Sequence, residues 1–241
     1  MEASPYGIAS MWSQGDFITK GVAILLIVMS IASWYVIATK ALQLFFYRRA
    51  AHAAGHEFWD ATTLDSGMAT LGSGNPFASI AQAGVTAMRH HEAHKGHLHD
   101  ELSVSDWITL SLRQAIDETQ ARLQTGMAVL ASVGSTAPFV GLFGTVWGIY
   151  HALVAIGTSG QAGIDKVAGP VGEALIMTAL GLAVAIPATF GYNALVRGNK
   201  SVIAKMNKFG FDLHALFVTG ARAKDGGNTT SGAKLVAVGA A

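Results

Sequence analysis

Two threonines and one glutamate carry most of the polar chemistry in the two longest apolar stretches of this chain. Thr145 lies in a run from 123 to 164 that contains no Asp, Glu, Lys or Arg, and Thr178 lies in a second run, 167–196, in which Glu173 is the only charged residue. A carboxylate inside or at the edge of such a run is costly and marks a functional site by default. Threonine hydroxyls both donate and accept hydrogen bonds, so they can hold water or orient an acidic group. Together, two hydroxyls and a carboxylate could line one polar track.

The spacing of the two threonines gives a geometric prediction. The Gly-rich segment 157–166 is typical of a turn between antiparallel helices, and the midpoint of residues 145 and 178 falls at 161.5, inside that turn. Both hydroxyls should therefore lie at a similar depth. Glu173 is closer to the turn by about 7–8 Å, and it points about 140° away from Thr178 around the helix. The carboxylate and the hydroxyls share one cavity only if several helices line it.

Each of these residues also has a plainer interpretation. Threonine in a membrane helix often bonds the carbonyl of its own preceding turn, which needs no pathway. Glu173 could be a carboxylate at the outer membrane interface. The matched depth of the pair favours a functional role, and both alternatives stay open at the level of sequence.

The composition places the chain among membrane proteins. Hydrophobic residues make up 51% of the 241 residues and charged residues 13%, against roughly 25% charged in soluble domains. The absence of cysteine excludes a thiolate site, and the net charge of +1 gives no sign of nucleic-acid binding. We expect an all-α membrane protein with three transmembrane helices and long cytoplasmic helical extensions. The expected segments are an N-terminal segment 1–20, transmembrane helices 21–40, 126–156 and 167–196, a cytoplasmic helical domain 41–125, a turn 157–166, a helical extension 197–219 and a disordered tail 220–241.

Basic residues predict how these helices are oriented. The segment before the first span and the turn 157–166 hold one Lys each, whereas 40–122 and the tail from Arg197 hold seven Lys and Arg each. Cytoplasmic segments carry the excess of positive charge. The N-terminus and the turn are therefore expected in the periplasm, and the C-terminus in the cytoplasm.

Small residues recur at steps of three and four in both apolar runs, which makes one smooth face on each helix. We expect these faces to pack closely and to support assembly of a helical-bundle oligomer. Prolines inside the same runs are expected to kink their helices. The packing residues are Gly134, Ala137, Gly141, Gly144, Gly148, Ala174, Gly181 and Ala185, and the prolines are Pro138 and Pro187.

A histidine-rich segment lies in the polar part of the chain, at positions 90, 91, 94, 97 and 99. Neutral imidazoles are good ligands for transition metals. The spacing matches no closed structural site, however, and Gly96 interrupts any helix that would align the ligands. A solvated loop without metal or cofactor is the favoured interpretation.

The two apolar tracts resemble a known family. The segment 131–148, Ala-Ser-Val-Gly-Ser-Thr-Ala-Pro-Phe-Val-Gly-Leu-Phe-Gly-Thr-Val-Trp-Gly, and the segment 167–193 are similar to the MotA/TolQ/ExbB family of proton-driven membrane motors, and within it to the ExbB form. The similarity is specific over about fifty residues, and three spans with an outer N-terminus fit ExbB or TolQ. The histidine-rich segment is not part of the family pattern.

The resemblance implies a multi-pass protein of the Gram-negative inner membrane. It implies a homopentamer whose central pore holds the transmembrane helices of an ExbD dimer, and a complex that uses the proton gradient to energise TonB for uptake such as that of ferric siderophores. The polar residues of the family correspond to Thr145, Thr178 and Glu173, and the proton-carrying Asp belongs to ExbD.

Two alternative functions differ from this one in their partner or their chemistry. A TolQ-type motor for outer-membrane integrity would use the same chemistry with a different partner. A membrane-embedded metal enzyme would need Glu173 as acid or base, and the spans offer neither a second intramembrane acid nor a nucleophile with a positioned base. We therefore expect no enzymatic activity.

Overall fold

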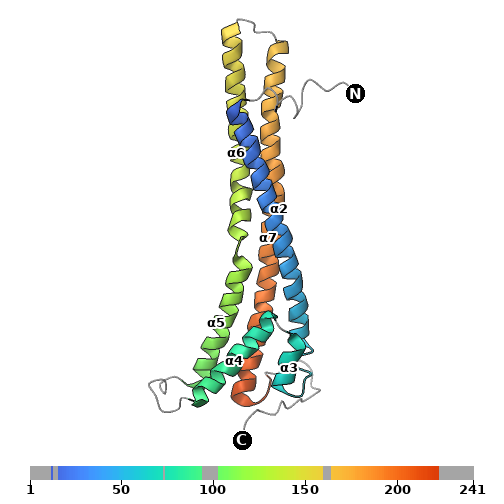
Figure 1. The fold of residues 1–241 in the computed structure, drawn as a ribbon, viewed down its shortest axis with the longest axis vertical. Helices are drawn as coiled ribbons and strands as arrows, with labels where there is room; N and C mark the ends of the chain where they lie inside the picture. Colours follow the sequence, from blue (N-terminus) through green and yellow to red (C-terminus); the bar gives the residue numbers. More distant parts are fainter. Residues whose placement is uncertain (1–11, 13–15, 73, 94–102, 160–163, 223–241) are drawn as a thin grey trace. The chain divides into compact units, whose positions relative to one another are not determined.

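The computed structural model describes residues 12, 16–72, 74–93, 103–159 and 164–222 of the 241. Within those ranges the regular structure is helical and contains no strand (Figure 1). The helices are α2 (Phe17–Gly55), α3 (Leu64–Leu71), α4 (Pro76–Ala93), α5 (Val104–Gln124), α6 (Met127–Ser159) and α7 (Ile164–Thr219).

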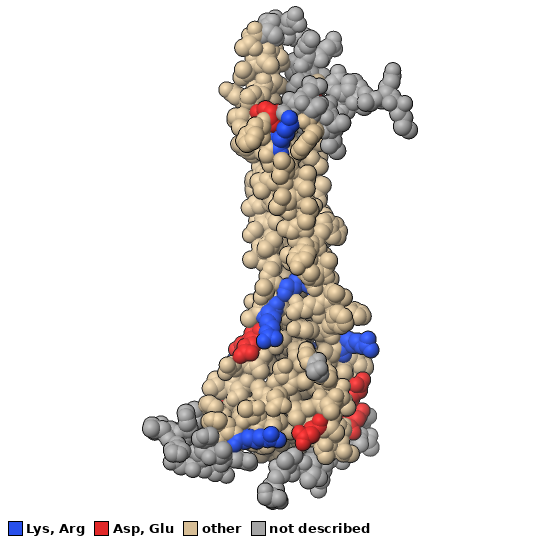
Figure 2. Space-filling view, in the orientation of Figure 1, with Lys and Arg blue, Asp and Glu red and all other residues tan. Residues whose placement is uncertain are grey.

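Three stretches of helix are long and apolar enough to cross a membrane, as the sequence predicts. They are Phe17–Gly55, Val104–Thr158 and Val171–Thr219. Figure 2 shows a band of surface with no Lys, Arg, Asp or Glu in view, and many large apolar side chains are exposed on these helices, among them Ile31, Phe139 and Phe190. Exposed apolar side chains of this kind suit contact with lipid.

The helices differ in length from the predicted spans. α2 begins at Phe17 and runs for 39 residues, and α7 continues for 56 residues through both the predicted span and the predicted extension. The break between α5 and α6 lies at Thr125 and Gly126, where Gly126 has φ of 81°, a conformation that glycine adopts without strain. The segments 160–163 and 223–241, which contain part of the predicted turn and most of the predicted disordered tail, lie outside the described residues.

The chain divides into two compact units. The first unit comprises 1–39 and 126–195, and the second comprises 40–125 and 196–241. α2 and α7 each contribute residues to both units, α6 belongs to the first unit, and α3, α4 and α5 belong to the second.

In the first unit, α6 and α7 approach so closely that their glycine backbones touch. A Cβ atom on Gly141 would lie 2.6 Å from the Met177 carbonyl oxygen and 3.0 Å from the Cα of Gly181. A Cβ atom on Gly181 would lie 2.7 Å from the Ala137 carbonyl oxygen. Real Cβ atoms do not approach other atoms this closely, so both positions require glycine.

The other small residues of the two faces line the same contact. Gly134 lies against Thr189, Gly144 against Met177 and Val22, and Gly148 against Ala174. Ala137 and Ala185 are buried in the core of the unit. The small-residue faces thus contact each other within one chain, and assembly between copies through them remains a prediction.

Both prolines lie inside continuous helices. Pro138 is in α6 and Pro187 in α7, and neither helix is interrupted there. The kinks predicted at these positions remain predictions.

The second unit has an aromatic core. The Phe209 ring on α7 packs edge-on against the rings of Phe58 and Phe77, with centroid distances of 5.1 and 5.4 Å. Trp59 adds a third ring at 5.9 Å from Phe209. This core holds the last part of α7 against the segment that follows α2 and the start of α4.

Two side chains donate hydrogen bonds to carbonyl groups at the C-terminal end of α5 in the second unit. The last carbonyls of a helix have no partner within it. The ammonium group of Lys40 donates to the Arg122 carbonyl oxygen at 2.8 Å, and the side-chain amide of Asn199 donates to the Leu123 carbonyl oxygen at 3.3 Å. The positive charge of Lys40 also suits the negative end of the helix dipole.

The histidine-rich segment lies mostly outside the description. His94, His97 and His99 are not described, and His91 is described only in its backbone. The His90 ring stacks on Trp107 with centroids 5.9 Å apart. Among the residues that the structure describes, no three His, Asp or Glu side chains group as metal ligands.

The glycine contact generates the first prediction. Gly141→Ala and Gly181→Ala should each lower the free energy of unfolding by about 1–3 kcal/mol, because the added methyl group overpacks two helices. The measurement is thermal unfolding of the purified full-length protein in detergent.

Gly157→Ala on α6 and Gly172→Ala on α7 are matched controls, since a Cβ atom at either position meets nothing within 4 Å. These two variants should gain up to about 1 kcal/mol from helix propensity. Equal effects at all four positions would contradict a packing requirement at Gly141 and Gly181.

Candidate functional site

The hydroxyl groups of Thr145 and Thr178 meet between α6 and α7. Their Oγ1 atoms are 2.6 Å apart, and Thr145 is buried, with 7% of its surface exposed. This agrees with the matched depth predicted from their equal distance from the turn. The part of these two residues in a proton pathway remains a prediction.

The Thr145 hydroxyl lies within hydrogen-bond distance of three oxygens. The Thr145 hydroxyl also lies 2.9 Å from the Ala174 carbonyl oxygen on α7 and 3.2 Å from the Gly141 carbonyl oxygen on its own helix. A hydroxyl has one proton, and a carbonyl oxygen only accepts. If the Thr145 proton goes to a carbonyl, the Thr178 hydroxyl donates in the contact between the two threonines; if it goes to Thr178, Thr145 donates.

The bond to the Gly141 carbonyl is the kind that threonine often makes with the preceding turn of its own helix, and such a bond by itself needs no proton pathway. Thr145 makes it together with two contacts across the helix pair, to Ala174 and Thr178. The residue therefore links two helices as well as its own backbone. Hydrogen bonds across helices of this kind contribute to helix association in membranes, together with close packing of small residues.

Glu173 lies on α7 next to the residue that Thr145 bonds. Its side chain is half-buried, and the neighbouring Ala174 accepts the Thr145 hydrogen bond and packs against Gly148. The five residues from Glu173 to Thr178 turn the carboxylate about 140° from the hydroxyl pair. The structure thus places the three predicted residues on neighbouring turns, and it brings together the two hydroxyls.

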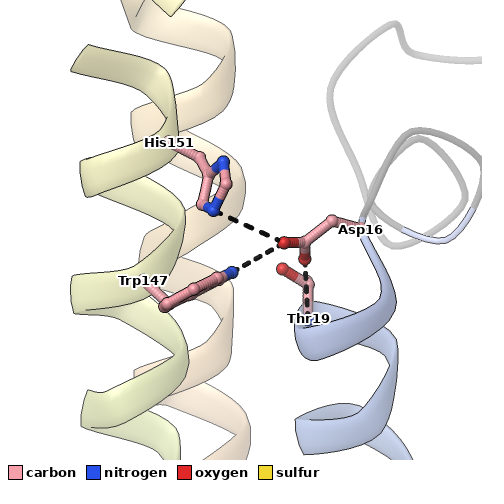
Figure 3. A network of polar contacts seen from close by, with 4 residues as sticks. All are labelled: Asp16, Thr19, Trp147 and His151. Carbon is pink, nitrogen blue, oxygen red and sulfur yellow. Dashed lines mark hydrogen bonds and ion pairs between the residues drawn. The ribbon is translucent and has the colours of Figure 1, made fainter. Parts of the chain in front are cut away.

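A second polar cluster, which no local sequence pattern predicts as a whole, lies at the start of α2. Figure 3 shows the Asp16 carboxylate between α2 and α6. One oxygen accepts from the Thr19 backbone N–H at 2.9 Å. The other accepts from the Trp147 indole N–H at 2.7 Å and lies 3.7 Å from Nε2 of His151. Asp16 therefore caps α2 and ties its first turn to α6.

This surrounding favours the ionised form of Asp16. Partial burial opposes the charge, but the hydrogen bonds from Thr19 and Trp147 outweigh it, with a contribution from the charge of His151. The pKa of the Asp16 carboxyl group consequently lies below its ordinary value of 3.8.

Part of this cluster has a signal in the sequence. Asp is a preferred N-cap residue, and Asp16 directly precedes the first apolar helix. The partners on α6 could not be found in this way, because Trp147 and His151 are more than 130 positions away, and only the packing of α2 on α6 brings them close.

These features define a class of protein: a multi-helix membrane protein with a hydroxyl pair between two closely packed spans. The family comparison agrees, since the model described as "MotA/TolQ/ExbB proton channel family" matches residues 73–208. The chain belongs to the MotA/TolQ/ExbB proton channel family.

Relatives in several organisms carry names from this family. The chain is 46% identical over 219 residues to "Biopolymer transport protein ExbB" of Xanthomonas campestris pv. campestris (strain B100). This alignment covers 88% of this chain and 87% of the relative. It is 37% identical to the ExbB of Neisseria meningitidis (strain DSM 15465 / Z2491), over 85% of this chain and 94% of the relative. It is 31% identical to "Tol-Pal system protein TolQ" of Pseudomonas aeruginosa (strain PAO1), in an alignment that covers 90% of this chain and 96% of the relative. The predicted resemblance to ExbB is confirmed.

The Asp16 cluster generates the second prediction. Asp16→Asn should destabilise the protein by about 1 kcal/mol at pH 7, because charge-assisted hydrogen bonds are lost from a partly exposed site. A carboxyl group with a depressed pKa stabilises above the unfolded pKa, and this stability is lost as the pH falls through the folded value. The difference between wild type and variant should therefore be at least as large at pH 5 as at pH 7 and shrink only below 3.8.

Thermal unfolding at matched pH measures this difference. Trp147→Phe is the paired variant, since it removes the indole donor and keeps an aromatic ring. A double variant no less stable than Asp16→Asn alone would support the contact, and additive losses would contradict it.

Proposed function

We propose that this chain is the motor subunit of an ExbB-type complex that uses the proton gradient across the inner membrane to energise TonB-dependent uptake. The observation that carries the proposal is the 2.6 Å contact between the Thr145 and Thr178 hydroxyls in a member of the proton channel family. The relatives named ExbB at 46% and 37% identity support this branch of the family. The role is mechanical and not enzymatic.

In this proposal the chain does not complete a proton relay by itself. The two hydroxyls can orient a group but do not ionise near neutral pH, and Glu173 is the only acidic residue between 167 and 196. A partner must supply a second titrating group. We assign that part to an Asp on the transmembrane helices of an ExbD dimer, held in the central pore of a homopentamer of this chain.

The proposed topology follows the distribution of basic residues. The N-terminal segment and the turn 157–166 lie in the periplasm, and α3, α4 and the C-terminal part of α7 lie in the cytoplasm. The three long apolar helices and the ExbB relatives fit a multi-pass protein of the inner membrane. Glu173, five residues nearer the turn than Thr178, then lies toward the periplasmic source of protons.

A TolQ-type role is the second candidate. It is favoured by the TolQ relative, which is similar over 90% of this chain. The identity of 31% to that protein is lower than the 46% to ExbB of Xanthomonas. We therefore rank energised uptake above a role in outer-membrane integrity.

The third prediction tests the hydroxyl pair. Thr145→Val and Thr178→Val keep the shape of the side chain and remove the hydroxyl. Both variants should assemble with ExbD and lose siderophore uptake by about tenfold or more, because the partner's acid loses its hydrogen-bonding group. Uptake is measured in cells with matched amounts of the protein in the membrane.

Thr145→Ser and Thr178→Ser are the matched controls, since serine retains the hydroxyl and loses only a methyl group. They should retain most of the uptake. A loss of uptake in the serine variants equal to that in the valine variants would show that packing, and not the hydroxyl, is what uptake requires.

The fourth prediction separates the carboxylate from the hydroxyls. Glu173→Gln keeps the size of the side chain and removes its titratable proton. The variant should assemble with ExbD and fail to support siderophore uptake at matched protein levels. Uptake close to that of wild type would show that Glu173 is only an interface residue. The proposed proton pathway would then consist of the two threonines and the partner's Asp.

A further inference from the structure

The exposed apolar surface of α2 continues into the second unit. Leu42, Phe45 and Phe46 are 57%, 62% and 57% exposed, and the Phe45 and Phe46 rings meet edge-on with their centroids 6.1 Å apart. Residues three or four apart on a helix share a face. Arg49, which is also exposed, follows at the same spacing. The apolar face formed by Leu42, Phe45 and Phe46 therefore ends in a cation.

A second guanidinium is held at the level of this apolar face. A Cβ atom on Gly198 of α7 would collide with Cδ2 of Leu44 and would lie 3.0 Å from Nη2 of Arg48. Leu44 and Arg48 are one turn apart on α2, and both reach the same residue of α7. Helix side chains point back toward the N-terminus of their helix. The Arg48 guanidinium consequently lies level with Leu44, the neighbour of Phe45 in the sequence.

Arg197 supplies a third cation, since it directly precedes Gly198 and is exposed. Both helices lack negative charge over several turns, because 17–56 on α2 and 174–211 on α7 contain no Asp or Glu. Within the part of the chain that the structure describes, none of the three arginine side chains has a hydrogen bond or an ion pair. The arginine cluster formed by Arg48, Arg49 and Arg197 is therefore available to an external anion.

The combination of charge and apolar surface selects a phospholipid. Guanidinium groups bind phosphate oxygens through paired N–H donors. A soluble phosphate compound would leave the apolar face in water, whereas a phospholipid brings acyl chains to that face and its phosphate to the arginine cluster. Exposed aromatic residues suit the level of the lipid headgroups. Arg49 follows Phe46 by three residues, which is about 4–5 Å along the helix, so its charge lies directly beyond the aromatic rings.

The balance of charge selects an anionic lipid over a zwitterionic one. The headgroup of phosphatidylcholine carries a quaternary ammonium group, which three guanidinium groups repel. Phosphatidylglycerol carries the negative charge of its phosphate without a compensating cation. Basic side chains at a membrane surface each strengthen the attraction to anionic lipids.

Two other occupants suit the site less well. The same face of a second copy would bring arginine against arginine, and like charges at an interface are unfavourable. A segment of an acidic protein would neutralise the arginine cluster. The apolar half of the site, however, belongs to a helix that is long and apolar enough to cross a membrane. A lipid is the partner that matches both halves.

We propose that the apolar face and the arginine cluster together bind an anionic phospholipid, with acyl chains on the apolar face and the phosphate on the guanidinium groups. The orientation of the chain decides only which leaflet supplies this lipid. The site therefore stands or falls separately from the proposed proton motor.

Native mass spectrometry of the delipidated full-length protein in detergent tests the proposal, with dioleoyl phosphatidylglycerol and dioleoyl phosphatidylcholine as the probes. Wild type should bind phosphatidylglycerol at least about tenfold more tightly than phosphatidylcholine. Arg49→Gln combined with Arg197→Gln should weaken the binding of phosphatidylglycerol by about tenfold. This pair leaves the contact of Arg48 with Gly198 in place. The absence of a preference in wild type would overturn the proposal.

Arg89→Gln combined with Arg113→Gln is the matched control, since these exposed arginines of α4 and α5 remove the same charge elsewhere in the second unit. Arg113 is one turn from Ile116, whose side chain lies against Gly210, and Gly210 is twelve residues beyond Gly198 on α7. The control should bind phosphatidylglycerol like wild type. Equal weakening would overturn the proposal, because attraction would then be a general effect of surface charge.

Phe45→Ser combined with Phe46→Ser tests the apolar face. Both rings are exposed, so the melting temperature should stay the same, while phosphatidylglycerol should bind at least about fivefold more weakly. Unchanged binding would show that the apolar face takes no part and would overturn the proposal.

Two competitors and the oligomeric mass distinguish the other occupants. Glycerol 3-phosphate, which has the phosphate without acyl chains, and an oligoglutamate peptide should not displace the lipid. Displacement by the first would identify a site for a soluble phosphate compound, and displacement by the second a site for an acidic polypeptide; either result would overturn the proposal. The arginine variant should keep the oligomeric mass of wild type. Loss of subunits with unchanged binding of phosphatidylglycerol would show a contact between copies and would also overturn it.

Discussion

The contact between the backbones of Gly141 and Gly181 is the constraint on which the site depends. In antiparallel helices, one turn forward along α6 from Gly141 reaches Thr145, and one turn back along α7 from Gly181 reaches Thr178. The two hydroxyls therefore meet at 2.6 Å because the glycines let the helices approach without a Cβ between them. A wider separation would leave each hydroxyl only its own helix carbonyl as a partner.

The same closeness accounts for the remaining packing of the first unit. Gly144 accommodates Met177 and Val22, so α2 joins the pair at the level of the contact. Without water in the hydrocarbon region, buried polar groups must find partners within the protein. Thr145 satisfies this requirement with carbonyls of two helices, and it leaves Thr178 at the half-buried end of the chain of hydrogen bonds.

How much the sequence could predict depended on how far apart the interacting residues lie. The three spans and the matched depth of the threonines follow from local composition and from counting residues across one short turn. α2 continues past the predicted first span, because a helix continues past the apolar segment when its polar part packs against other helices, whereas α7 ends at Thr219, where the predicted extension also ends. Contacts such as Lys40 with Arg122, or Asp16 with Trp147, join distant segments, and no local pattern indicates which residues will meet.

The two carboxylate oxygens of Asp16 make different contacts. This couples the capping of α2 to the packing of α2 on α6. One oxygen holds the first turn of α2 and the other holds Trp147 on α6. If the first turn frays, the carboxylate moves and the link to α6 is lost as well; if α6 moves away, the carboxylate loses the Trp147 hydrogen bond that helps to hold it at the cap. Local opening at this end of the first unit should therefore be cooperative, with the start of α2 and its attachment to α6 exchanging their amide protons as one unit.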